Sequence, residues 1–139
     1  MPSKNVVIVS HNHYDHLDDE TVSNLKNKDK IHVIVPLGFN SFFIERGYNK
    51  VTELNWGQLV SVEGIEITAE PAVHDSARSI SDHNATLWAS WVIENPQKRI
   101  LFIGDTGYSS TIFKDIGDKY ALSDYAILPI WAYEPRELI

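Results

Sequence analysis

The sequence contains no cysteine, which excludes disulfide bonds and thiolate metal ligands together. Long hydrophobic runs are also missing: the run at 6–9 is too short for a signal-peptide core, and no stretch approaches the roughly 20 apolar residues of a membrane span. Basic residues are outnumbered, 12 Lys and Arg against 19 Asp and Glu. Since no basic stripe could displace counterions from phosphates, we expect no nucleic-acid partner. These absences favour a cytoplasmic protein without a membrane span.

The remaining composition is that of a globular protein. The chain has 139 residues, of which 43% are hydrophobic and 22% charged, and the formal net charge is -7. This length suffices for one domain with a real core, and no repeat, linker or low-complexity tract interrupts it. We therefore treat 1–139 as a single domain.

Hydrophobic periodicity predicts a mixed α+β chain. The predicted helices span 18–28 and 38–46, and a third begins at Ser109 or Ser110. The first predicted strand is continuously apolar and is expected to be buried on both faces. The last predicted strand is almost wholly apolar. The predicted strands are 6–10, 31–35, 51–54, 58–62, 65–69, 86–94, 99–104 and 125–130.

Metal-ligating side chains crowd the stretch SHNHYDHLD at 10–18, directly after the first predicted strand. His11 and His13 are two residues apart, so in an extended segment both side chains leave the same side of the backbone and can hold one ion. Asp15 and His16 are adjacent, and their side chains are aimed at a neighbouring point. Imidazole and carboxylate are ligands that zinc prefers, so the stretch predicts a metal site, with room for a second ion.

The other candidate donors are less distinctive. His74 and Asp105 each come just after a predicted strand, so one end of a sheet could gather them with His11. Taken alone, His74 could be a surface residue and Asp105 a helix or turn cap. His32 falls within a predicted strand and His83 in a polar turn, and neither is assigned to the site.

Four segments in this order, SHNHYDHLD, PAVHDSAR, FIGDTGY and PIWAYEPR, resemble the metallo-β-lactamase superfamily, and within it the branch of N-acyl-phosphatidylethanolamine phospholipase D. The resemblance implies an αβ/βα sandwich with two zinc ions at one edge. It implies that His11, His13 and His74 hold one zinc, that Asp15 and His16 hold the other, and that Asp105 bridges them.

Two departures from that family pattern matter. Only ten residues precede His11, and no histidine follows His83 to supply the last ligand of the family. We therefore expect this chain to be a partial domain, covering only the middle to the C-terminal part of the fold. The second zinc should bind more weakly than the first, and uncovered sheet should favour self-association.

The implied activity is zinc-dependent hydrolysis of a phosphodiester, phospholipase D-like, on a small-molecule or lipid-like substrate, unless the fragment is inactive. Asp15 would orient the attacking water. Arg78 and Arg136 are candidates for the substrate phosphate, though each could form a surface salt bridge, and Tyr108 and Tyr133 could line the cleft. The alternatives are a metal-dependent lactonase or other hydrolase of this fold, and a non-catalytic metal-binding fragment that needs a partner.

Overall fold

The computed structural model describes residues 5–130, which contain eight β-strands and three α-helices. These residues form two compact units. Within the described residues, the first unit comprises 5–56 and Asp75–Trp88, and the second comprises Gly57–His74 and 89–130. Each unit contains its own sheet, so each is described separately.

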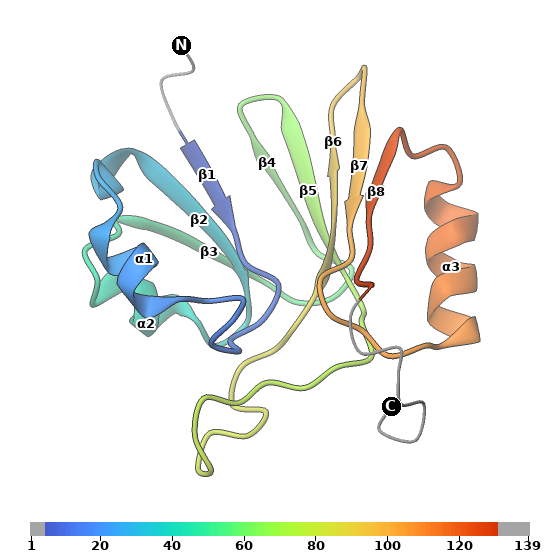
Figure 1. The fold of residues 1–139 in the computed structure, drawn as a ribbon. Coiled ribbons are helices and arrows are strands. Elements are labelled where there is room, and N and C mark those ends of the chain that lie inside the picture. Colours follow the sequence, from blue (N-terminus) through green and yellow to red (C-terminus); the bar gives the residue numbers. More distant parts are fainter. Residues whose placement is uncertain (1–4, 131–139) are drawn as a thin grey trace. The chain divides into compact units, whose positions relative to one another are not determined.

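The first unit is built on a three-stranded parallel sheet with the order β1-β2-β3. Its strands are β1 (Asn5–Ile8), β2 (Ile31–Pro36) and β3 (Lys50–Leu54). Helices α1 (Asp19–Asn24) and α2 (Asn40–Ile44) connect successive strands and cover one face of the sheet (Figure 1). Every residue of β2 is buried, as expected for the central strand of a covered parallel sheet.

One apolar cluster fills the space between this sheet and its helices. Alternate strand residues such as Val33 and Val35 face the helices, which contribute Val22 and Phe43. The fully buried Tyr48 joins them, and its hydroxyl group donates to the carbonyl oxygen of Val22 at 2.7 Å. Because its polar atom is satisfied, the ring adds apolar contact without the cost of a buried unpaired hydroxyl.

The second unit is built on a five-stranded sheet with the order β4-β5-β6-β7-β8. Adjacent strands are antiparallel except for the parallel pair β7 and β8. The strands are β4 (Leu59–Val62), β5 (Ile65–Glu70), β6 (Ser90–Glu94), β7 (Arg99–Phe102) and β8 (Tyr125–Ile127).

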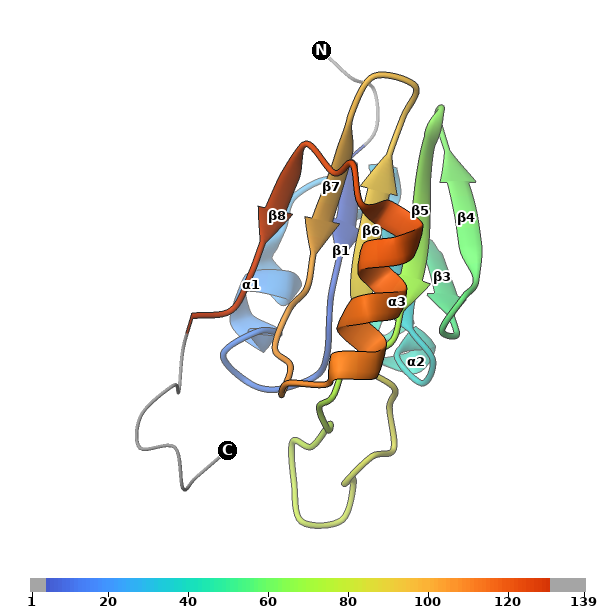
Figure 2. The same cartoon turned by 90° about the vertical axis from the view of Figure 1, so that its right-hand side faces the viewer.

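Helix α3 (Ser110–Tyr120) lies along one face of the five-stranded sheet (Figures 1 and 2). It begins at the Ser109 cap, whose side chain accepts from the amide of Ile112. At its other end Tyr120 donates to the buried carboxylate of Glu70 at 2.6 Å, and Lys119 reaches the same carboxylate at 3.2 Å. Burial, reinforced by the hydrogen bond to Glu70, raises the pKa of Tyr120.

The structure confirms the mixed class but shortens both early helices. The predicted helix 18–28 ends at Asn24, because Leu25 turns to an extended conformation and Asn27 adopts a left-handed one. The predicted helix 38–46 is α-helical only over Asn40–Ile44. The turns that follow it end at Gly47, which has the positive φ of 85° expected of a residue after a helix.

Three strand predictions also need correction. The first strand spans Asn5–Ile8 and is only partly buried, because among residues 5–130 β1 pairs with β2 alone and forms an edge of its sheet. The strand predicted at 86–94 begins only at Ser90, since residues 86–89 belong to an irregular connection. The apolar last strand is shorter, Tyr125–Ile127, and its side chains are exposed, because β8 is an edge strand within the described residues.

Candidate metal centre

The histidine loop, residues 10–18, leaves the carboxyl end of β1 and folds into a tight turn. The amides of His16 and Leu17 both donate to the carbonyl oxygen of His13, at 3.1 and 2.8 Å. Leu17 then inserts into the apolar cluster of the first unit and is 2% exposed. The loop is thus anchored at its far end by burial and closed internally by backbone hydrogen bonds.

This turn gathers three imidazole rings. The ring of His11 lies 4.7 Å from that of His13 and 4.3 Å from that of His16, measured between centroids. A ring nitrogen of His11 lies within 4.8 Å of one on His13, and likewise of one on His16. The Nδ1 atom of His11 is 3.0 Å from the Ser10 hydroxyl, so Nε2 is the nitrogen available to a metal.

Asp15 stands at the tip of the turn. Its carboxylate lies 3.6 Å from Nε2 of His16, and its side chain is 76% exposed. A carboxylate in this position can bind a metal beside His16 and can still be reached by a ligand that arrives from solvent. The three imidazoles predicted from the motif are therefore near one another in the first unit, whereas Asp15 approaches only His16 among them.

His74 and Asp105 belong to the second unit, where sheet topology places them at the same end. β5 and β7 run in the same direction because each is antiparallel to β6, and His74 and Asp105 follow β5 and β7 respectively. A bridge between Val73 and Gly107 joins the two connections: the amide of Gly107 donates to the carbonyl oxygen of Val73 at 2.6 Å. His74 and Asp105 thus follow strands at the same end of one sheet, but the expectation that this sheet would also carry His11 is wrong, because β1 belongs to the separate three-stranded sheet.

Asp75 was not predicted as a functional residue. It belongs to the first unit, where its carboxylate lies 4.0 Å from Nε2 of His13 and 3.4 Å from Nε2 of His83. Its neighbour His74 is one peptide bond away, which is about 3.8 Å between Cα atoms. The only signal in the sequence was its position directly after His74.

The two unassigned histidines have structural surroundings. His32 is buried in β2, with Nε2 2.8 Å from the Thr52 hydroxyl of the neighbouring strand. His83 lies in a turn, as expected, and 62% of its side chain is exposed.

Among the predicted substrate ligands, Arg78 points its guanidinium group at the histidine loop. Its Nη1 atom donates to the carbonyl oxygens of Asn12 and Leu17. Tyr108 is exposed and lines a cavity of about 250 Å³ in the second unit, together with Phe113 and Leu128. Tyr133 and Arg136 lie outside the described residues.

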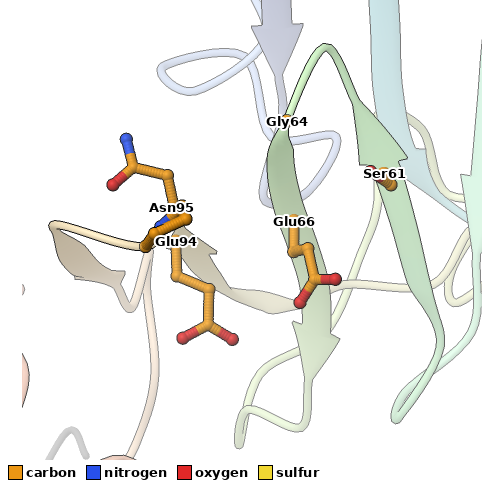
Figure 3. A pocket seen from close by; sticks show the side chains of 6 residues that line it. Ser61, Gly64, Glu66, Glu94 and Asn95 are labelled. Carbon is orange, nitrogen blue, oxygen red and sulfur yellow. The ribbon is translucent and has the colours of Figure 1, made fainter.

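The second unit has another, larger hollow of about 370 Å³, shown in Figure 3. Glu66 and Glu94 face each other across β5 and β6 on its wall, beside Ser61 of β4. Arg99 donates to the carboxylate of Glu94 at 2.6 Å, whereas Glu66 has no ion pair within the part of the chain that the structure describes. A pocket with this lining is a poor site for an anionic substrate, despite its size.

Comparison with known proteins agrees with these observations. The model of the family described as beta-lactamase superfamily domain matches residues 1–139. The chain belongs to this superfamily. It is 40% identical over 146 residues to the N-acyl-phosphatidylethanolamine-hydrolyzing phospholipase D 1 of Caenorhabditis elegans, which covers 98% of this chain and 41% of that protein.

Two further similarities concern a relative in sequence and a solved structure with the same fold. A metal-dependent hydrolase of Saccharolobus solfataricus is 31% identical over 90% of this chain and 52% of its own length. The metallo-beta-lactamase fold protein YhfI of Bacillus subtilis superposes with a TM-score of 0.56 at 17% identity, covering 81% of this chain and 45% of that structure. The predicted fold family is thus confirmed, and the chain spans about half the length of these relatives or less.

Proposed function

We propose that this chain carries the metal-binding part of a hydrolase that cleaves a phosphodiester, and that the metal is zinc. The observation on which the proposal chiefly rests is the histidine loop, where the ring of His11 lies against those of His13 and His16. The names of two relatives, a phospholipase D and a metal-dependent hydrolase, support the same reaction class.

The donor set suits a dinuclear zinc site. We propose that His11, His13 and His74 hold one ion, that Asp15 and His16 hold the other, and that Asp105 bridges them. Imidazole nitrogens and carboxylate oxygens are zinc ligands, and the Ser10 hydroxyl beside Nδ1 of His11 is the kind of partner that fixes the orientation of a ligand ring. The position of Asp75, bonded to His74 and 4.0 Å from His13, supports the addition of His74 to this set.

The second ion should bind more weakly than the first. Among its proposed ligands Asp15 is 76% exposed, and only one imidazole, that of His16, contributes. A site with fewer neutral nitrogen ligands is expected to bind zinc less tightly. Titration of the metal-free protein with zinc by calorimetry should resolve one tight and one weaker event, and two equally tight events would contradict this proposal.

Bound zinc would supply a water of lowered pKa and would offset the charge on the phosphoryl oxygens. The chain itself contributes orientation and proton transfer. The exposed Asp15 carboxylate can accept a hydrogen bond from the attacking water and align it toward phosphorus. Leu17 is buried in the core and holds this turn in place. Asp15 therefore needs little reordering before it can act.

The apolar cavity beside Tyr108 is consistent with an amphipathic substrate. It begins at Ile103, two residues before Asp105, and its lining includes the rings of Tyr108 and Phe113, whose centroids lie 5.9 Å apart. A lipid-like diester could place its apolar part here while its phosphate group reaches the metal ligands. Water-filled apolar cavities favour such occupants because burial removes hydrocarbon from water.

A turnover assay with purified full chain tests the activity. Zinc-loaded protein should hydrolyse bis-p-nitrophenyl phosphate faster than any member of a lactone panel, and Asp15→Asn should lower kcat at least about a hundredfold. His83→Asn, which changes an exposed turn histidine, serves as the matched control and should retain activity. Zinc binding without turnover on any substrate would instead favour a non-catalytic metal-binding fragment, and selective lactone opening would favour a lactonase.

We also propose that the exposed edge at β8 favours self-association. Tyr125 and Ile127 are 60% and 56% exposed on a strand with one open edge among the described residues. An exposed edge strand presents unpaired backbone groups that can form hydrogen bonds with a strand of another chain. Light scattering should therefore detect oligomers at high concentration that Ile127→Lys reduces, whereas a monomer at all concentrations would contradict the proposal.

A further inference from the structure

We propose that Arg78 is a positioning residue that sets the shape of the histidine loop before any metal binds. It comes from the bracing loop, residues 75–88, which belongs to the same unit as the histidine loop. The inference rests on the proposed function for its consequence, metal affinity, but its structural basis lies entirely in contacts among residues of the first unit.

One nitrogen of Arg78 closes the histidine loop. Nη1 donates to the carbonyl oxygen of Asn12 at 2.8 Å and to that of Leu17 at 2.7 Å. The segment between these two carbonyl groups contains three of the four proposed ligands of the loop. A single guanidinium group therefore fixes the distance between the two ends of that segment, in the same way that a bidentate clamp fixes a ligand.

Tyr14, inside that segment, holds Arg78 in return. The guanidinium carbon of Arg78 lies 4.2 Å from the centroid of the Tyr14 ring, a cation–π contact. The Tyr14 hydroxyl donates to the carbonyl oxygen of Arg78 at 2.9 Å. The two loops are therefore joined by reciprocal contacts, side chain to backbone in both directions, and neither can shift without breaking several of them.

The bracing loop is itself built to present Arg78. The Asp82 carboxylate accepts from the amides of Arg78 and Ser79, at 2.9 and 2.7 Å, and these hydrogen bonds lower the pKa of Asp82. Ser76 is fully buried, and its hydroxyl group donates to the carbonyl oxygen of Thr86. An internally bonded loop of this kind loses little entropy when its arginine engages the neighbouring loop.

These contacts separate two roles for Arg78. If the guanidinium group binds the substrate phosphate, its removal would raise the Michaelis constant but would not change loop stability or metal affinity in the protein without substrate. A guanidinium group that shapes the histidine loop would affect loop stability and metal affinity even without substrate. Removing outer partners of metal ligands typically lowers metal affinity about 10–100-fold.

The decisive test compares Arg78→Met and Arg78→Lys with the parent, using the full chain. Amide hydrogen exchange of metal-free protein reports the turn directly, because the amides of His16 and Leu17 donate to the carbonyl oxygen of His13. We expect both amides to exchange at least about tenfold faster in Arg78→Met, with partial recovery in Arg78→Lys, whose ammonium group still donates hydrogen bonds. Zinc affinity by calorimetry and the visible spectrum of the cobalt(II) form should change in the same order.

Arg46→Met is the matched control. Arg46 also lies in the first unit, pairs with Asp19 and donates to the carbonyl oxygen of Phe42, but no hydrogen bond joins it to residues 10–17. The Arg46→Met variant should lower the stability of the protein without selectively accelerating amide exchange at His16 and Leu17. Unchanged exchange of these amides in Arg78→Met would overturn the inference. If parent and variants all fail to bind zinc while exchange still increases in Arg78→Met, the positioning role stands and the metal proposal fails.

Discussion

The two units assemble their polar donors in different ways. In the first unit, His11, His13, Asp15 and His16 come from one turn of the chain, closed by hydrogen bonds between residues three and four apart. In the second, His74 and Asp105 are 31 positions apart and are brought to one end of the sheet by the shared direction of β5 and β7. The first arrangement is local and the second depends on sheet topology.

The two sheets also differ in how completely they are covered. β2 is buried along its whole length between β1 and β3, whereas β8 exposes all of its residues at the edge of its sheet. The local donor loop thus stands on a well-packed support, and the apolar edge of the second unit is the less protected part of the described residues. Three experiments, taken in order of expected effect, test this contrast.

Phe43→Ala should produce the largest loss of stability. Phe43 is fully buried in the core of the first unit, with its ring 5.3 Å from that of Tyr48, so truncation should cost about 3–5 kcal/mol of unfolding free energy. Ile127→Ala, on the exposed strand β8, should cost no more than about 0.5 kcal/mol. Urea unfolding measures both. Similar losses of unfolding free energy would contradict the claim that the core of the first unit is better packed than strand β8.

Gly38→Ala should have an intermediate effect. Gly38 has φ of 96°, and an added Cβ atom would come within 2.9 Å of the carbonyl oxygen of Ala85 in the bracing loop. Gly64 in the second unit has a similar φ of 83° but open space around it. We expect about 2–3 kcal/mol for Gly38→Ala and about 1 kcal/mol for Gly64→Ala, since only the first adds a collision to backbone strain. Equal losses by thermal unfolding would contradict the close approach.

Arg46→Gln should give the smallest effect, and one that depends on pH. The hydrogen-bonded Arg46 guanidinium lowers the pKa of Asp19 from 3.8 to about 2. A depressed carboxyl pKa stabilises the folded state above pH 3.8, and that contribution is lost as the pH falls toward 2. In the variant, the pKa of Asp19 in an NMR titration should return toward 3.8. A pKa that stays near 2 would exclude Arg46 as the cause. Because Asp19 is half exposed, added salt should reduce the effect on stability.

The sequence was informative where structure is local. The histidines of the motif at 10–18 lie together as the pattern indicated, because alternation and adjacency act over a few residues, and the turn at His83 followed from its polar neighbours. The lengths of α1 and α2 were overestimated because the sequence pattern does not show where the backbone leaves the helix: Leu25 is extended and Asn27 left-handed after α1, and only turns follow Ile44 after α2.

Longer-range features could not be read from the sequence in the same way. The apolar composition of 125–130 predicts a strand but not that β8 lies at a sheet edge, which depends on strand order. The contacts of Arg78 with Asn12 and Leu17 join residues more than 60 positions apart, so phosphate binding was an equally reasonable expectation. Asp75 could be connected with His13 only once the bracing loop was seen.

The most direct test of the metal site is a crystal structure of the zinc-loaded protein with anomalous scattering recorded at the zinc edge. We expect a tightly bound zinc ligated by His11, His13 and His74, with a weaker neighbouring peak beside Asp15 and His16 and with Asp105 between the two. Zinc bound by the histidine loop without His74 and Asp105, or zinc found only elsewhere, would contradict the proposed centre.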